Sequence, residues 1–229
     1  MRGLLFAARS AAVGIALLIA ACSGPTATPP PCPTTAPTAD QAASILADAT
    51  AVEIKTNKGS FTIELQPDSA KLATANFVAL ARCGFYDGLS FHRVIAGFVA
   101  QAGDPQTRDD HGDFAGVGTG GPGYHFDVEI PPATTQYRKY MVAMANAMQY
   151  DPSSGEILGG TDTNGSQFFV MLDDAPALRP YYSVLGTVVS GTGTVDAIGQ
   201  LPTTGDPTNV PLDPAIIEAA TVQSPPQSS

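Results

Sequence analysis

The 229-residue chain is long enough for one large domain or two small ones. Its 21 acidic residues outnumber its 11 basic ones, and the formal net charge of −10 argues against binding to nucleic acid and against electrostatic docking to anionic lipid. The 3 cysteines and 3 histidines follow no zinc-ligand spacing, so we expect neither a metal nor a cofactor.

The first predicted element is a signal peptide at residues 1–21, which contain two arginines, an apolar run and no acidic residue. The apolar run is too short for an ordinary membrane-spanning helix. It ends in Ile-Ala-Ala-Cys, which resembles a bacterial lipobox, so we expect Cys22 to be lipidated and to hold the protein on the extracytoplasmic face of the cell membrane. The alternative is an ordinary cleavable signal followed by a chance cysteine.

Residues 22–50 are predicted to be a tether. The segment is rich in Pro, Thr, Ala and Ser, a composition that is typical of an extended and mobile chain. Cys32 lies in the tether and Cys83 near the end of a predicted helix. An exported compartment permits a disulfide between them, but a mobile tether is a poor partner for a folded domain, so we expect both thiols to be free.

A single domain is predicted at residues 51–222. Alternating apolar residues and turn residues predict strands at 51–56, 60–65, 89–95, 97–102, 140–145, 167–172, 184–189 and 216–222. A helix is expected at 69–82, with Asp68 or Ser69 as its N-cap and Gly84 after its last turn. A second, short helix fits residues 194–199.

Eight strands with only two helices exclude an alternating parallel α/β fold. Closing the sheet would remove its edges and give the apolar residues a single interior. We therefore predict a mainly β fold, a closed eight-stranded antiparallel β-barrel capped by two helices. Residues 223–229 are predicted to be a disordered tail.

Polar side chains interrupt the apolar strands at four positions: Arg93, Gln101, Asn146 and Gln167. A lone arginine in a strand usually faces solvent on the outer side of a sheet. Four such groups beside Phe98 and Phe169, however, indicate an apolar pocket with a polar rim.

Five strings go further than composition. In chain order they are FHRVIAGFVAQAGD, GTGGPGYHF, MANA, TNGSQFF and VLGTV, and together they resemble the cyclophilin family of peptidyl-prolyl cis/trans isomerases over residues 51–222. The resemblance implies an eight-stranded barrel with two capping helices, in agreement with the strand pattern. It also implies an active groove on the outside of the barrel.

Matched motif by motif, the resemblance implies that Arg93 is the catalytic arginine, with Gln101 beside it in the groove. The implied substrate-binding residues are Phe98, Val99, Phe169 and Leu178 for the proline ring, Ala145 and Asn146 for the substrate backbone, Gln167 for the rim, and Tyr182 where many members have a histidine. In this reaction no covalent bond is formed and no proton needs to be transferred. An arginine that donates to the prolyl nitrogen when the amide is twisted would be enough.

The chain departs from the family pattern in three further places. Pro176 and Ala177 stand where the family often has a tryptophan, and the loops at 106–117 and 149–160 look long. Both loops should flank the groove. The resemblance therefore indicates the reaction but not the range of substrates. The acidic string DDHGD at 109–113 lacks a full set of calcium ligands and is interpreted as a solvated loop.

The sequence thus predicts a monomeric isomerase that accelerates X-Pro rotation in proline-containing polypeptides of exported proteins. The alternative is a non-catalytic proline-binding chaperone or scaffold on the same fold, since a fold does not settle a function. The glycine-rich run at 118–123 lacks the Lys-Ser/Thr of a phosphate-binding loop and is interpreted as a tight turn lining the groove.

Overall fold

The structure is a computed structural model and describes residues 28–108 and 116–225. The predicted signal peptide at 1–21 and the predicted lipidation site Cys22 lie outside the described residues. The same holds for the acidic string at 109–113 and for the last four residues of the predicted tail, whereas residue 223 belongs to the last strand.

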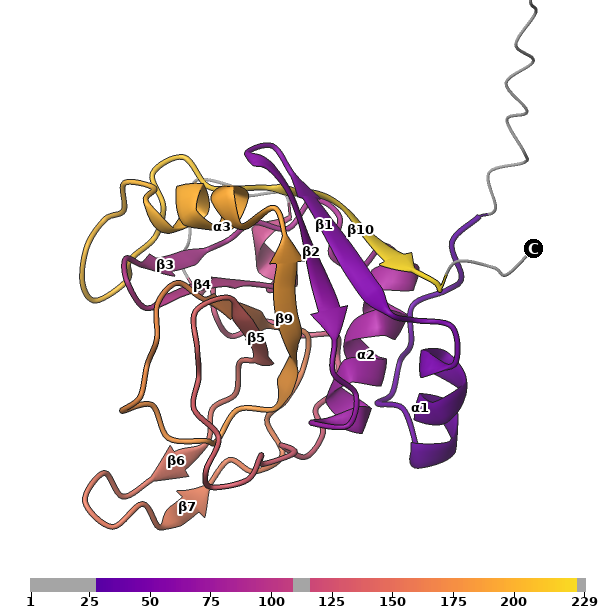
Figure 1. Cartoon of the computed structure of the whole chain (residues 1–229), viewed down its shortest axis with the longest axis horizontal. Coiled ribbons are helices and arrows are strands. Elements are labelled where there is room, and N and C mark those ends of the chain that lie inside the picture. Colours follow the sequence, from indigo (N-terminus) through magenta and orange to yellow (C-terminus); the bar gives the residue numbers. More distant parts are fainter. Residues whose placement is uncertain (1–27, 109–115, 226–229) are drawn as a thin grey trace, which may run out of the picture.

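The fold is mainly β, as predicted. Eight antiparallel strands form one curled sheet in the order β10-β1-β2-β9-β5-β8-β4-β3 (Figure 1). Their bounds are β1 Ala51–Thr56, β2 Gly59–Leu65, β3 Arg93–Ile95, β4 Val99–Ala102, β5 Met141–Met144, β8 Phe168–Met171, β9 Val184–Ser190 and β10 Ile217–Gln223. A separate two-stranded hairpin consists of β6 Gln149–Tyr150 and β7 Ile157–Gly159.

The prediction of a closed barrel is wrong, because the sheet is a half-barrel whose end strands β3 and β10 do not pair as strands. An isolated bridge between Ser90 and Ile216 and a few backbone hydrogen bonds connect the segment that precedes β3 to the start of β10. β3 is three residues long, and the Val94 N–H donates to the Asn209 carbonyl at 2.9 Å. A loop that precedes β10 therefore occupies the edge of β3 in place of β10 itself.

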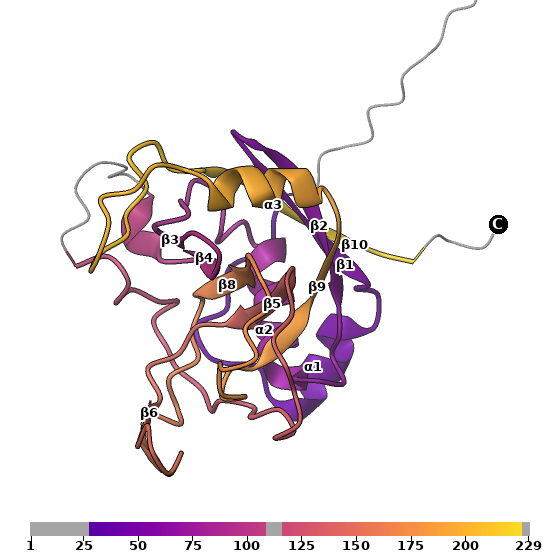
Figure 2. The ribbon, with the colours of Figure 1, turned by 60° about the vertical axis from the view of Figure 1, so that its left-hand side comes forward.

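Three α-helices are found in the described residues, one more than predicted: α1 Ala39–Leu46, α2 Lys71–Arg82 and α3 Thr192–Gly199, with a short 3₁₀ turn at Pro105–Thr107. α2 contacts β9 and β10 at one end of the half-barrel, and α3 contacts β2, β3 and β4 at the other (Figures 1 and 2). Neither these helices nor any other in the described part of the chain is long and apolar enough to cross a membrane.

The start of α2 differs from the prediction. Its N-cap is Ala70, whose side chain has no acceptor. Instead, the Glu129 carboxylate reaches from a distant loop and accepts hydrogen bonds from the backbone N–H groups of Leu72 (3.0 Å) and Ala73 (2.7 Å). A carboxylate satisfies the free donors there and complements the positive end of the helix. Gly84 follows the last turn with φ 74°, as predicted.

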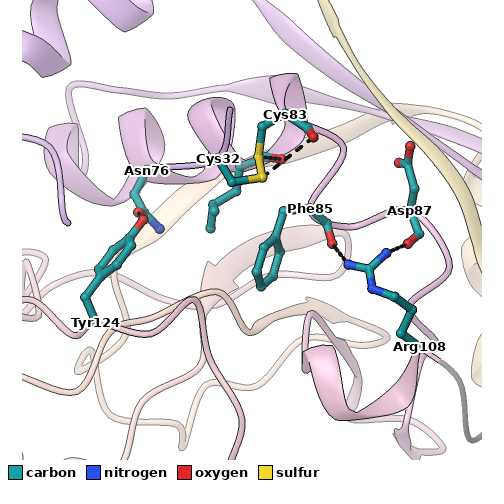
Figure 3. The surroundings of a disulfide bond; sticks show 8 residues. Cys32, Asn76, Cys83, Phe85, Asp87, Arg108 and Tyr124 are labelled. Atoms are coloured by element: carbon teal, nitrogen blue, oxygen red, sulfur yellow. Dashed lines mark hydrogen bonds between the residues drawn. A yellow bond between two sulfur atoms is a disulfide. The ribbon is translucent and has the colours of Figure 1, made fainter. Parts of the chain in front are cut away.

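The predicted free thiols are wrong as well, because Cys32 and Cys83 form a disulfide with an S–S distance of 2.07 Å (Figure 3). The bond joins the predicted tether to the C-cap of α2. Close to it, the Arg108 guanidinium donates to the carbonyls of Phe85 (2.6 Å) and Asp87 in the turn that follows α2. The disulfide thus attaches the N-terminal segment to the end of α2, next to a turn that the Arg108 hydrogen bonds stabilise.

The predicted tether also contains α1, the helix that the sequence did not predict. α1 begins at a capping box, in which Thr38 Oγ1 accepts from the Gln41 N–H at 3.3 Å and the Gln41 side chain accepts from the Thr38 N–H at 2.8 Å. α1 packs against α2, and Arg82 donates to the Ile45 carbonyl at 2.8 Å and pairs with Asp48 at 2.5 Å. We name residues 28–50, fixed by the helix and the disulfide, the N-terminal strap.

The apolar residues form two clusters. The larger one fills the space between the curled sheet, α2 and α3. The smaller one lies on the outer face of β4, β5 and β8 and is made of Val99, Tyr137, Ala143, Phe169, Met171 and Val184, with half-buried neighbours that include Phe98, Leu178 and Tyr182. Because side chains alternate along a strand, the same three strands supply both clusters.

Candidate active site

Nine of the ten predicted groove residues line one pocket of about 140 Å³ on the outer face of the half-barrel. They are Arg93, Phe98, Val99, Gln101, Ala145, Asn146, Phe169, Leu178 and Tyr182. We name this the proline pocket. The tenth, Gln167, lines an adjoining pocket of about 390 Å³ that shares Gln101, Ala145 and Asn146 with the first.

Strand register places these side chains together. Arg93 lies opposite Gln101 in the β3–β4 pair, Gln101 lies opposite Phe169 in the β4–β8 pair, and Phe169 lies opposite Ala143 in the β5–β8 pair. Residues directly opposite each other in antiparallel strands share a face of the sheet. A row of side chains therefore crosses four strands on the outer face, with the arginine at its edge.

The polar members of the site form a chain of hydrogen bonds. Arg93 Nη1 donates to Gln101 Oε1 at 3.4 Å, Gln101 Nε2 donates to Gln167 Oε1 at 2.8 Å, and Gln167 Nε2 donates to the Gly120 carbonyl at 2.9 Å. A guanidinium can only donate and a carbonyl can only accept, so the two ends fix the orientation of both amides. The guanidinium is thereby held against the wall of the pocket.

Gly120 is fixed in turn by Asp104, which the sequence analysis did not select. The fully buried Asp104 carboxylate accepts from the backbone N–H groups of Gln106 (2.8 Å), Gly118 (2.6 Å) and Gly120 (3.1 Å). A Cβ atom on Gly120 would lie 2.2 Å from Asp104 Oδ1, so no other residue fits there. Gly118 to Gly121 line the adjoining pocket of about 390 Å³. The signal for Asp104 in the sequence was an acidic residue two positions after an apolar strand.

The apolar wall of the proline pocket is aromatic. The rings of Phe169 and Tyr182 meet edge to face at 5.3 Å, and Tyr182 also contacts the buried Tyr137 at 6.1 Å. The Tyr137 hydroxyl donates to the Tyr182 carbonyl at 2.8 Å and accepts from the Tyr182 N–H at 3.0 Å. Burial raises the pKa of the Tyr182 hydroxyl, which therefore stays neutral at physiological pH. Tyr137, another residue that the sequence analysis missed, fixes the backbone at Tyr182.

The Asn146 side chain forms hydrogen bonds within the protein. Its Nδ2 donates to the Tyr181 carbonyl at 2.8 Å and its Oδ1 accepts from the Met148 N–H at 3.1 Å. These bonds hold the turn after β5 beside the pocket. The role that the family resemblance implies for Asn146, binding of the substrate backbone, stays a prediction.

His92, next to the catalytic candidate, does not line the pocket and is only 3% exposed. Burial lowers its pKa to about 4, although the neighbouring Asp104 carboxylate acts in the opposite direction. The imidazole is therefore neutral at neutral pH. Within residues 28–108 and 116–225, no three His, Cys, Asp or Glu side chains gather in a way that could hold a metal ion.

The comparisons with known proteins agree with this geometry. The family described as cyclophilin type peptidyl-prolyl cis-trans isomerase/CLD matches residues 51–222. A peptidyl-prolyl cis-trans isomerase of Helicobacter pylori is 42% identical over 149 residues, which cover 64% of this chain and 78% of the relative. Peptidyl-prolyl cis-trans isomerase A of Mycobacterium tuberculosis is 37% identical over 196 residues, which cover 78% of this chain and 94% of the relative.

The solved structures point to the same fold. A crystal structure of a cyclophilin type peptidyl-prolyl cis-trans isomerase of Cryptosporidium parvum superposes with a TM-score of 0.64 at 32% identity, covering 78% of this chain and 99% of that one. A structure of the same protein in the presence of the dipeptide Ala-Pro gives a TM-score of 0.62.

The chain belongs to the cyclophilin-type peptidyl-prolyl cis-trans isomerase family. It is an enzyme, a peptidyl-prolyl cis-trans isomerase, and enzymes of this family act on proline-containing peptides.

Proposed function

We propose that the protein accelerates X-Pro rotation without a covalent intermediate, through hydrogen-bond donation by Arg93 to the prolyl nitrogen. The observation that carries the proposal is the position of the guanidinium, which lies at the wall of a small aromatic pocket and is held there by Gln101 at 3.4 Å. The pocket would hold the proline ring while the preceding carbonyl turns.

The chemistry needs no more than this. Rotation about the C–N bond meets a barrier of about 18–20 kcal/mol because it breaks amide resonance. In the twisted transition state the prolyl nitrogen has a localised lone pair, which the planar amide lacks. A donor aimed at that nitrogen binds the transition state more tightly than either ground state, which is the condition for catalysis. A reduction of the barrier by roughly 4 kcal/mol would give about a thousandfold acceleration.

The hydrogen-bond chain supports this role because it fixes the donor in advance. Arg93, Gln101 and Gln167 are tied to the Gly120 carbonyl, and the buried Asp104 carboxylate holds the loop at Gly120. Donors that are already oriented stabilise a transition state without reorganisation during the reaction. An arginine also stays charged and presents a rigid fork, which a lysine does not.

The test is steady-state kinetics on one short X-Pro peptide. Arg93→Ala should lower kcat by roughly 10²–10³-fold with a much smaller change in KM, since the lost interaction exists mainly in the transition state. Arg93→Lys should recover little of the rate. Arg138→Ala is the matched control, because Arg138 forms an exposed ion pair with Asp174 away from the pocket. A folded Arg93→Ala protein with parental kcat would disprove the mechanism, and peptide binding without rate enhancement in the parent would favour a binding module.

We also propose that the substrates are exported proteins and that the enzyme is lipid-anchored at Cys22 on the extracytoplasmic face of the membrane. The lipobox-like end of the apolar segment supports this location. So does the Cys32–Cys83 disulfide, because such bonds persist in oxidising compartments outside the cytoplasm.

Fractionation of cells that express variants would test the anchor. Cys22→Ser should appear as soluble or unprocessed protein, whereas the Cys32→Ser/Cys83→Ser double variant should stay with the membrane. A processed Cys22→Ser protein that remains in the membrane fraction would refute the anchor.

A further inference from the structure

Two departures from the family pattern meet at one place in the structure. The long segment at 149–160 forms the hairpin β6–β7, and Pro176 and Ala177 replace the tryptophan that the family often has. Both border a pocket of about 560 Å³, which we name the hairpin pocket. It is lined by Ala133, Thr134, Thr135, Gln136, Tyr150, Pro152, Pro176, Ala177, Leu178, Arg179 and Pro180. Small residues leave the space open, and the hairpin supplies a wall.

The hairpin is held in place rather than free. The Tyr181 hydroxyl donates to the Gly155 carbonyl at 2.6 Å, Arg179 Nη2 donates to the Pro152 carbonyl at 2.9 Å, and the rings of Tyr150 and Tyr181 meet at 5.1 Å. Gly155 has φ 79°, and a Cβ atom there would lie 2.3 Å from Arg179 Nη1. The wall of the pocket is therefore formed before any ligand arrives.

The hairpin pocket adjoins the proline pocket. Leu178 lines both, and the segment that anchors the hairpin runs on directly into Tyr182 of the aromatic wall. The adjoining pocket beside Gln167 meets the proline pocket through other residues, Gln101 and Ala145 among them. A polypeptide whose proline occupies the middle pocket therefore has a separate pocket for residues toward Leu178. Extended chain advances about 3.3 Å per residue, so this pocket lies within a few residues of the proline.

The lining of the hairpin pocket is mixed. Proline rings, Tyr150 and Leu178 supply apolar walls for a side chain, whereas Thr134, Thr135 and Gln136 supply polar groups from the opposite loop, and no carboxylate lines the pocket. Its one charged residue, Arg179, is already bound to the Pro152 carbonyl. Ile157 lies opposite Tyr150 in the β6–β7 register and so shares its face. Apolar surface thus extends from Tyr150 in the pocket to Ile157 on the hairpin.

We propose that the hairpin pocket binds an apolar side chain of the same polypeptide substrate, a few residues from the isomerised proline. The enzyme then selects prolines that are flanked by apolar residues, which are exposed in chains that have not yet folded. This inference rests on substrate binding at the proline pocket, and it is independent of how Arg93 acts.

The experiment compares kcat/KM for five peptides. One is a four-residue X-Pro peptide, and the others are two pairs of longer peptides, one pair for each side of the proline, with leucine or serine at the second to fourth positions on that side. The parent should favour the leucine peptide by roughly tenfold on one side, as expected for burial of one apolar side chain. Tyr150→Ser removes part of the wall, and Ala133→Trp fills the pocket from the opposite loop. Both should reduce the leucine-to-serine ratio to near one.

Leu212→Ser is the matched control, because Leu212 is 69% exposed and lies outside the pocket. It should leave the ratio unchanged. A parent enzyme that treats the leucine and serine peptides alike on both sides of the proline would overturn the proposal, and so would a ratio that survives both pocket variants. Sedimentation of the parent and of Tyr150→Ser adds a further check, since self-association lost in the variant would assign the surface to a second copy instead. If Arg93→Ala kept full activity, the mechanism would fail while the peptide ratio still tested the pocket.

Discussion

The two faces of β4, β5 and β8 use the same strands for opposite purposes. On the inner face, Ala100, Val142 and Phe168 are buried in the core between the sheet and the helices. On the outer face, Val99 and Phe169 have half-buried neighbours and leave the proline pocket open. Two-residue alternation thus makes a packed core on one side and an open pocket on the other.

The difference is clearest for two consecutive aromatic residues. The Phe168 ring is surrounded by the rings of Phe77 (5.3 Å), Tyr86 (5.5 Å) and Phe91 (6.2 Å). In the described part of the chain, the Phe169 ring pairs with one other ring, that of Tyr182 at 5.3 Å. The comparison teaches that an apolar residue in this sheet serves stability or binding according to its face, and that its hydrophobicity does not decide which.

The largest expected effect follows from these two residues. Phe168→Ala should lower the free energy of unfolding by about 3–5 kcal/mol, because it leaves a closed cavity in the core. Phe169→Ala should cost roughly 2 kcal/mol, since the space it leaves opens to solvent, but it should weaken binding of X-Pro peptides by about tenfold. Urea unfolding and peptide titration of both variants measure this, and equal losses of stability with unchanged peptide binding would break the comparison.

The N-terminal strap belongs to neither face and provides a second contrast. Cys32→Ser/Cys83→Ser should lower the free energy of unfolding by about 2–4 kcal/mol, because the disulfide no longer restricts the unfolded chain. Parental kcat is expected, since the bond lies at the C-cap of α2 and not at the pocket. The parent under reducing conditions should match the double variant. A stability that does not respond to reductant would contradict the prediction.

A smaller effect concerns how the stability of the protein depends on pH. Burial lowers the pKa of His92 to about 4 in the folded protein, below its ordinary value of 6.5. The unfolded chain therefore binds the proton more readily between these values, so this contribution to stability is present above pH 6.5 and is lost as the pH falls toward 4. At pH 5 the loss should be roughly 2 kcal/mol.

His92→Gln should remove that part of the pH dependence, as measured by urea unfolding at pH 7 and pH 5 for both proteins. The rate should stay nearly flat from about pH 6 to 8, because arginine does not titrate there and the proposed mechanism transfers no proton. A bell-shaped rate profile that disappears in His92→Gln would show that the histidine takes part in the chemistry.

The smallest expected effect concerns the polar chain on the outer face. Gln101→Ala should lower kcat/KM by about tenfold, because Arg93 loses the neighbour that orients it, while the free energy of unfolding falls by only about 1 kcal/mol. Gln200→Ala is the matched control, because Gln200 is an exposed amide at the end of α3 and lines neither the proline pocket nor the hairpin pocket. Loss of stability without loss of rate would show that the chain serves the fold alone.

The gathering of nine candidate residues in one pocket could be predicted from the sequence, because these residues lie in short strings with fixed spacing. Arg93, Gln101 and Phe169 come together through strand register, which a two-residue period already implies. The closed barrel was wrong because the edge of β3 is covered by the loop at Asn209, a contact that no local pattern encodes.

Other features depended on contacts between distant segments. The Glu129 carboxylate that caps α2 is far away in the chain, so the local N-cap candidates were misleading. The composition of residues 28–50 hid both the capping box at Thr38 and the disulfide. The length of the segment at 149–160 was visible in the sequence, but its hairpin and its pocket became evident only from the anchoring contacts of Tyr181 and Arg179.

The disulfide also sets how far the catalytic domain could travel. A fully extended chain from Cys22 to Ala51 would reach roughly 100 Å, whereas the stretch from Cys22 to Cys32 reaches at most roughly 35 Å. With the lipid that we propose on Cys22, the oxidised enzyme would stay within about its own diameter of the bilayer, roughly 40 Å. Reduction of the Cys32–Cys83 bond would extend that reach only as far as Thr38, to roughly 55 Å, because α1 still packs against α2.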